Sequence, residues 1–155
     1  MMLIKRHLAF SLLAVAIVLL LVPAARGVAQ SFTVKAGQEE TRILSLVVED
    51  HVQIRFTVIG QTISTLDFYV TDPNGYIMKT FGAIGNVNYA FVCSQKGDYT
   101  LHFSNVASAE DKLVSLDYDV TPYIYGIPQT LFLVLVIVGI CMVMVTVFIL
   151  TSKHP

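Results

Sequence analysis

The sequence predicts an all-β fold, an antiparallel β-sandwich of about eight strands, followed by one C-terminal transmembrane helix. Runs of alternating apolar and polar residues recur roughly every 8 to 12 residues between residues 30 and 121, as they do in antiparallel sandwiches. No helical period interrupts these runs. A later run of twenty residues carries no charge and is long enough to span a bilayer.

Residues 1–29 have the three parts of a secretory signal peptide. Lys5 and Arg6 precede a long apolar run, and small residues follow it. Cleavage after Gly27 or after Ala29 satisfies the preference for small residues at the first and third positions before the cut. The alternative is an uncleaved anchor, because the apolar run approaches the length that spans a membrane.

The strands begin directly after the signal peptide and continue to residue 121. One side of each run is apolar and predicts a core, whereas the other side is polar and predicts a solvent-facing surface. A section of this size can bury one core between two sheets. The runs are, in order, residues 32–34, 41–48, 52–58, 66–71, 76–81, 87–93, 99–104 and 114–120.

Two of the connecting turns have recognisable chemistry. In Asp72-Pro73-Asn74-Gly75, the proline ring fixes φ and the glycine accepts a positive φ, so two strands should meet there as a hairpin. The segment 95–98, which contains Lys-Gly-Asp, joins the next two runs in the same way.

Residues 131–150 meet the length criterion for a transmembrane helix. A core element of so small a domain would not need twenty consecutive uncharged positions. Tyr123 and Tyr125 precede the run, where aromatic rings anchor at the membrane interface, and Lys153 follows it. The positive-inside rule then places the tail, residues 151–155, in the cytoplasm and the sandwich on the other side of the membrane.

The composition agrees with this division. Hydrophobic residues make up 55% of the chain and charged residues 14%, whereas about a quarter of an average soluble domain is charged. The two uncharged terminal runs account for the excess. Residues 30–121 hold all eleven acidic residues and six of the ten basic ones, a net charge of −5. Nucleic-acid binding is therefore not expected, because phosphate recognition requires clustered Lys and Arg.

The two cysteines exclude a disulfide within the sandwich. Cys141 lies in the predicted span, which leaves Cys93 as the only thiol of the domain. Cys93 shares one side of its strand with Tyr89 and Phe91, so we expect it to be a small buried side chain. An intermolecular bridge or a reactive thiol is the alternative.

No catalytic or metal-binding motif is present. His51 follows two acidic residues at a turn and His102 points outward on its strand, and neither has the spacing of a nucleophile, metal or acid-base site. Asp67, Asp72 and Asp98 could meet at one end of the sandwich and bind Ca²⁺, but acidic residues beside turns are more often simply solvated. We therefore predict no enzyme, no cofactor and no metal, and we assign no site residues.

Three local segments resemble the GOLD-domain (Golgi dynamics) transmembrane proteins. Residues 66–75, LDFYVTDPNG, are similar to that family's LDxxFxxxDPxG segment, and residues 97–105, GDYTLHFSN, to its G-x-Y-x-x-C-F-S-N segment. Residues 37–41 lie where the family has an E-C segment. The resemblance implies a GOLD or jelly-roll-like sandwich and the family's role in vesicle transport, as cargo receptors and coat adaptors between endoplasmic reticulum and Golgi.

The chain departs from the family pattern in three places. Thr41 and His102 occupy the positions of the family's two bridged cysteines. The linker, residues 122–130, contains two prolines and a glycine and cannot form the family's coiled coil. The tail, residues 151–155, lacks the family's aromatic and paired-lysine coat signals.

These features predict a single-pass type I membrane protein that presents a non-catalytic sandwich for protein or cargo binding. The expected location is the endoplasmic reticulum or Golgi in a eukaryote and the cell membrane in a prokaryote, with the domain lumenal or extracellular. Because the linker extends to at most about 35 Å, the partner should be another membrane or membrane-proximal protein. The alternative is a prokaryotic-type surface-anchored sandwich that binds a polysaccharide or supports an envelope complex.

The signal peptide gives a first testable prediction. Mass spectrometry of the protein purified from membranes should show an N-terminus at Val28 or Gln30, because both cleavage positions satisfy the small-residue rule. An intact Met1 would contradict removal and would place both chain ends on the cytoplasmic side.

Overall fold

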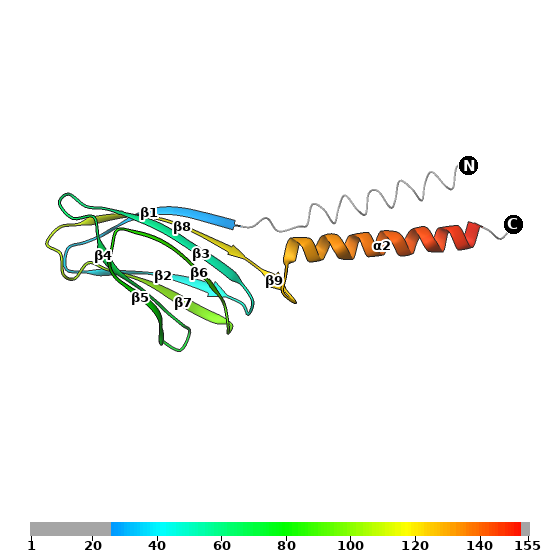
Figure 1. Ribbon diagram of the computed structural model, residues 1–155, viewed down its shortest axis with the longest axis horizontal. Coiled ribbons are helices and arrows are strands. Elements are labelled where there is room, and N and C mark those ends of the chain that lie inside the picture. Colours follow the sequence, from blue (N-terminus) through cyan, green and yellow to red (C-terminus); the bar gives the residue numbers. More distant parts are fainter. Residues whose placement is uncertain (1–25, 153–155) are drawn as a thin grey trace. The chain divides into compact units, whose positions relative to one another are not determined.

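A computed structural model describes residues 26–152, with side chains for residues 29–150 (Figure 1). Most of the predicted signal peptide, and Lys153 of the predicted tail, lie outside the described residues. The chain divides into two compact units, which are described separately. One is the sandwich, Ala25–Tyr123, and the other includes Ile124–Pro155.

Two four-stranded sheets build the sandwich. One sheet has the strand order β1-β8-β3-β6 and the other β2-β7-β4-β5, and all neighbours are antiparallel. The predicted antiparallel sandwich is therefore confirmed. The strands are β1 (Arg26–Val34), β2 (Glu39–Leu46), β3 (His51–Ile59), β4 (Leu66–Thr71), β5 (Ile77–Ile84), β6 (Asn86–Val92), β7 (Gly97–Ser104) and β8 (Lys112–Thr121).

The core follows the predicted alternation along the strands. In β3, every second residue from Val52 to Val58 is buried and the residues between them face outward. Three rings from both sheets meet in the middle: Phe56 lies 4.8 Å from Phe68 and 5.3 Å from Phe103, measured between ring centroids. Burial of each such side chain stabilises the fold by about 1.5–3 kcal/mol.

The turn between β4 and β5 forms as predicted. Both the Asn74 and the Tyr76 backbone N–H donate to Asp72 Oδ1, at 2.9 and 2.8 Å, and Gly75 has a φ of 83°. β5 continues to Ile84, three residues beyond the predicted run, because two register shifts let its mixed sequence follow β4.

The first strand begins earlier than predicted. β1 pairs with β8 from Arg26 opposite Val120, although residues 26–29 read as a cleavage region in the sequence. Cleavage after Gly27 would remove two residues of this strand, and cleavage after Ala29 would remove four. Either cut leaves the remaining residues of β1 to pair with the first half of β8.

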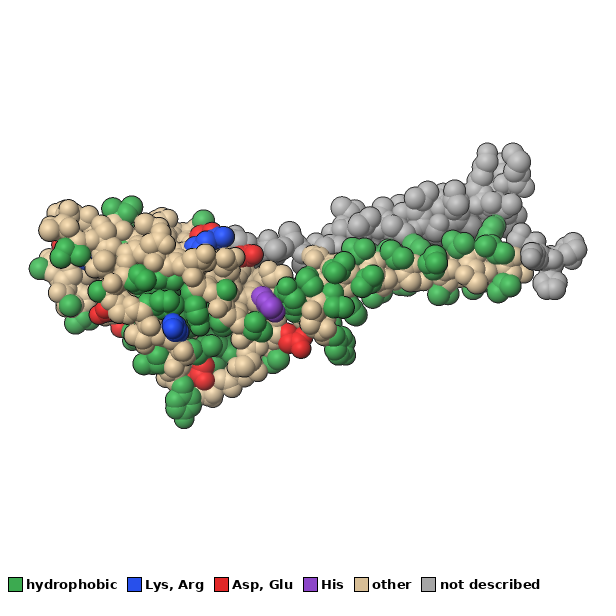
Figure 2. Space-filling model, in the orientation of Figure 1, with side chains coloured by type: hydrophobic (Ala, Val, Ile, Leu, Met, Phe, Trp, Pro, Cys, Tyr) green, Lys and Arg blue, Asp and Glu red, His purple; other side chains and the backbone are tan. Residues whose placement is uncertain are grey.

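The second unit contains helix α2, Gln129–Ser152. Its part Gln129–Leu150 is long and apolar enough to cross a membrane, and hydrophobic side chains cover the visible side of the helix (Figure 2). Ahead of it, β9 (Tyr123–Ile124) and β10 (Ile127–Pro128) form a two-stranded hairpin. Tyr125 and Gly126 at its tip both have a positive φ, 53° and 73°, as a tight two-residue hairpin turn requires.

The state of Cys93 gives a second prediction. Its side chain is buried and its thiol donates to the Gln95 carbonyl oxygen at 3.0 Å. A fragment spanning residues 26–123 should therefore unfold at the same temperature, within about 1 °C, with and without reductant, because no cross-link is lost. A reductant-induced drop of several degrees would point to an intermolecular disulfide.

Candidate functional site

The loops at one end of the sandwich enclose an open hollow of about 420 Å³. The β3–β4 and β7–β8 loops form its walls, together with the first residues of β4 and Ala83 of β5. This is the left-hand end of the sandwich in Figure 1. β8 starts in the hollow at Lys112 and leaves the sandwich at Thr121, so the hollow lies at the end opposite the one where the chain departs.

A charged pair fastens the β3–β4 loop beside the hollow. The Lys112 ammonium group is almost fully buried, donates to the Ile63 carbonyl oxygen and lies 2.9 Å from Glu110 Oε1. The backbone N–H groups of Thr62 and Ile63 donate back to the Glu110 carboxylate at 3.0 Å each. The Ile63 N–H, followed by Lys112 and then by the Thr62 N–H, lowers the pKa of Glu110 to about 2.

Asn105 ties three further segments together at the same end. Its Nδ2 donates to the carbonyl oxygens of Val34, Lys35 and Glu110, at 3.2, 3.2 and 2.9 Å. The side chain is 2% exposed and lines the hollow, yet its Oδ1 is buried with no hydrogen-bond partner among residues 26–152. Buried acceptors of this kind are uncommon in native proteins, because leaving one unsatisfied costs about 1–3 kcal/mol.

Asp67 and Ser104 lie at the rim of the hollow, on the outer face of the second sheet. Ser104 of β7 stands between Asp67 of β4 and Glu39 of β2 in one row across the strands. The exposed Asp67 carboxylate has no hydrogen bond or ion pair within the described part of the chain. The rim therefore carries a negative charge that the described residues leave uncompensated.

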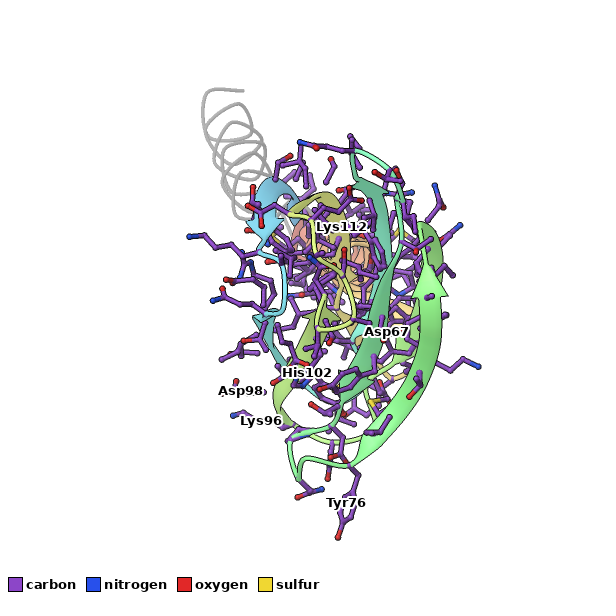
Figure 3. All side chains as sticks on the ribbon, turned by 90° about the vertical axis from the view of Figure 1, so that its left-hand side faces the viewer. Asp67, Tyr76, Lys96, Asp98, His102 and Lys112 are labelled. Carbon is purple, nitrogen blue, oxygen red and sulfur yellow. The ribbon has the colours of Figure 1, made fainter. Side chains whose placement is uncertain are left out.

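The structure separates the aspartates that could have formed a Ca²⁺ site. Asp67 is at the hollow, whereas Asp72 and Asp98 lie at the other end of the same sheet. There Asp72 holds the turn between β4 and β5, and Asp98 accepts a hydrogen bond from the Ser45 hydroxyl. Asp67 and Asp98 are well separated in Figure 3. Among residues 26–152, no group of three His, Cys, Asp or Glu side chains could hold a metal ion.

His102 points outward, as predicted, and it is the centre of a hydrogen-bonded cluster. Its Nδ1 lies 2.8 Å from Glu39 Oε1, and its Nε2 lies 3.1 Å from Thr71 Oγ1. The Tyr69 ring stacks on the imidazole at 4.2 Å, and the Tyr69 hydroxyl donates to Glu39 at 3.1 Å. Burial, followed by the hydrogen bond to Glu39, raises the pKa of Tyr69. The cluster joins β2, β4 and β7.

The arrangement of hydroxyl, imidazole and carboxylate in this cluster matches that of nucleophilic hydrolases. However, Thr71 is 9% exposed, and neither Thr71 nor His102 lines the hollow. The position of the cluster therefore indicates a link between strands. The other histidine of the sandwich, His51, is exposed at the opposite end and stacks on the Tyr123 ring at 3.8 Å.

Thr41 and His102 are directly opposite one another on β2 and β7. The two positions at which the resemblance implied paired cysteines are thus adjacent in space. The hydrogen bond of His102 to Glu39 links these strands at the place where the resemblance implies a disulfide.

No local pattern in the sequence predicted most of the hollow. Lys112 and Glu110 flank the last strand in a polar segment that resembles a solvated loop, and Asn105 stood out only as the final residue of the segment GDYTLHFSN. These residues meet because β7 ends and β8 begins at the same end of the sandwich.

The chain matches one family model, that of the emp24/gp25L/p24 family/GOLD, over residues 29–131. This match covers more than half of the chain. No curated protein matches the chain significantly.

Several solved structures are similar over the sandwich. The periplasmic inhibitor of g-type lysozyme PliG from Aeromonas hydrophila is 17% identical, with 63% of this chain and 88% of that chain covered and a TM-score of 0.45. PliG from Salmonella Typhimurium is 12% identical, with 63% of this chain and 90% of that chain covered and a TM-score of 0.43. The structure of BiXyn10A CBM1 is 15% identical, with 58% of this chain and 69% of that chain covered and a TM-score of 0.38.

The opposed positions of Thr41 and His102 give a third prediction. Opposite Cα atoms in antiparallel strands are about 4.5–5.5 Å apart, which is within the range that a disulfide spans. Thr41→Cys/His102→Cys should therefore form a bridge, and the oxidised variant should be roughly 2–4 kcal/mol more stable than the same variant after reduction. Ile43→Cys/His102→Cys, displaced by two residues, should stay reduced. Equal bridging of both pairs would contradict the register of β2 and β7.

The lowered pKa of Glu110 gives a fourth prediction. Folding favours the ionised carboxylate, so its stabilisation is complete above the ordinary pKa of 4.5 and is lost as the pH falls toward about 2. Glu110→Gln should therefore lower the free energy of unfolding at pH 6, and the difference from the unaltered protein should shrink between pH 4.5 and 2. Denaturant unfolding at several pH values measures this. Glu40→Gln is the control, and a pH-independent difference for Glu110→Gln would refute the proposed cause.

Proposed function

The chain belongs to the emp24/gp25L/p24 family/GOLD, and from this membership we propose that it is a single-pass type I membrane protein that binds protein cargo through its sandwich. The sandwich is lumenal or extracellular and non-catalytic, and the protein serves in vesicle transport. Membership supports the secretory pathway as its location.

Helix α2 supports the membrane anchor in this proposal. Its apolar part, Gln129–Leu150, has 22 residues, and about 20 are needed to cross the hydrocarbon core. Lys5, Arg6 and Lys153 support the orientation, with the sandwich on the side opposite to the cytoplasmic tail.

The hollow is the observation that carries the binding role. Its walls come from loops at the end of the sandwich opposite the exit of the chain, so the linker does not occupy it. Binding sites are typically concave, with a few polar groups among apolar ones. The hollow has this character, with Ile63 and Leu66 beside Asp67, Asn105 and Lys112.

The short linker supports a membrane-bound or membrane-proximal partner. Tyr123 stacks on His51 of the sandwich, and helix α2 begins six residues later at Gln129. Six residues extend to at most about 20 Å. The sandwich therefore stays near the membrane, which favours a membrane-bound or membrane-proximal partner.

Crosslinking tests this proposal. A photo-crosslinking amino acid at Ala107, exposed at the rim of the hollow, should capture integral membrane proteins or membrane-bound cargo in native membranes. The same amino acid at Ser31, exposed on the outer face of the other sheet and away from any hollow, should capture them much less. Equal capture at the two positions, or capture of soluble proteins only, would refute binding of membrane cargo at the hollow.

A further inference from the structure

We propose that the hollow binds a basic side chain, a lysine ammonium or an arginine guanidinium, which the cargo protein places beside Asp67 and Ser104. This inference rests on the proposed binding function and adds the chemical class of the group that is recognised. Charge, hydrogen-bonding capacity, shape and rigidity each support it.

The charges of the hollow favour a cation. Three of its lining residues are ionisable: Asp67, Glu110 and Lys112. The ion pair between Glu110 and Lys112 is internally neutral, so Asp67 is left as the uncompensated charge. Glu39 is one further carboxylate in the same row, beyond Ser104. The sandwich as a whole is also acidic, with eleven acidic and six basic residues in residues 30–121, which favours encounter with a basic partner.

The free hydrogen-bonding groups at the rim can accept. The Asp67 carboxylate lacks a donor within the described residues, and the neighbouring Ser104 hydroxyl, which can accept as well as donate, has no partner there either. Lysine and arginine side chains are donors only, with three and five N–H groups, so they complement this set. A charged donor also makes hydrogen bonds roughly twice as strong as a neutral one.

The lining of the open hollow can accommodate an extended side chain. Its walls include the small residues Ala83, Ala107 and Ala109, which leave the space open. Ile63 and Leu66 provide apolar surface on which the methylene stem of lysine or arginine can pack while the charged head reaches the polar groups. No aromatic ring lines the hollow, so a sugar would lack a ring face to pack on, and a basic side chain is the better fit than a glycan.

The walls are held in place before a ligand arrives. Glu110 and Lys112 fix the β3–β4 loop, and Asn105 fixes the β7–β8 loop. Gly60 packs so closely that a Cβ atom there would lie 2.2 Å from the Ile63 carbonyl oxygen. Rigid walls reduce the ordering cost of binding, so even one side chain should bind measurably.

The test uses the full chain in lipid nanodiscs and four probes. Nα-acetyl-arginine amide and Nα-acetyl-lysine amide carry the predicted groups. Nα-acetyl-citrulline amide is the uncharged analogue of the first, and methyl α-mannopyranoside represents a glycan. Backbone amide shifts in residues 104–112 report binding. The two basic probes should bind with dissociation constants in the millimolar range. The citrulline probe should bind at least about tenfold more weakly.

Asp67→Asn should weaken binding of the two basic probes about fivefold or more, because the substitution removes the negative charge with little change of shape. Asp98→Asn is the matched control, a carboxylate at the other end of the same sheet, and should leave binding unchanged. An unchanged unfolding midpoint for Asp67→Asn shows that the variant is folded.

Three results would overturn the inference: citrulline binding as well as arginine, Asp67→Asn without effect, or binding of the mannoside alone. The inference and the proposed function can fail separately. If Ala107 still crosslinks membrane proteins while the basic probes do not bind, the ligand class is wrong. If the probes bind but Ala107 captures no membrane partner, the function is wrong.

Discussion

The burial of every second side chain between two four-stranded sheets is the constraint from which the rest of the sandwich follows. Phe56, Phe68 and Phe103 join the inner faces, so those faces are fully used by the core. The outer faces carry most of the polar side chains, in rows such as the one that contains Asp67. The loops at the strand ends bring together residues distant in sequence, which explains why such residues line the hollow.

The missing disulfide shows how one structural task can be met by different chemistry. β2 is an edge strand whose only neighbour is β7, and in the family a bridge at this place would hold it. Here the contacts of His102 with Glu39 and Thr71, and of Tyr69 with Glu39, connect β2 to β7 and β4. Such hydrogen bonds are individually worth about 0.5–1.5 kcal/mol, more where a group is charged. They do not depend on the redox state of the compartment.

The parts of this fold that depend on periodicity could be predicted, and the parts that depend on juxtaposition could not. The alternation in β3, the turn at Asp72 and the uncharged run of α2 are local signals, and each was confirmed in the structure. The start of β1 was missed because its first residues match a cleavage site equally well. The hollow was missed because Asp67 and Lys112 are 45 positions apart in the chain and neither lies in a motif. Their meeting is set by the strand order, which no local pattern contains.

The pairing of β1 with β8 can form only after β8 has been synthesised. Among the described strands β1 has no other neighbour in its sheet, and 87 residues must be translated after Val34 before β8 is complete at Thr121. At roughly 5–20 residues per second this takes on the order of several seconds. Throughout that interval the first strand has nothing to pair with and remains an extended, accessible chain. If the predicted signal peptide is cut after Gly27 or Ala29, the cut falls in this window, since afterwards the same bonds belong to a paired strand. The late synthesis of the last strand thus leaves the predicted cleavage region accessible.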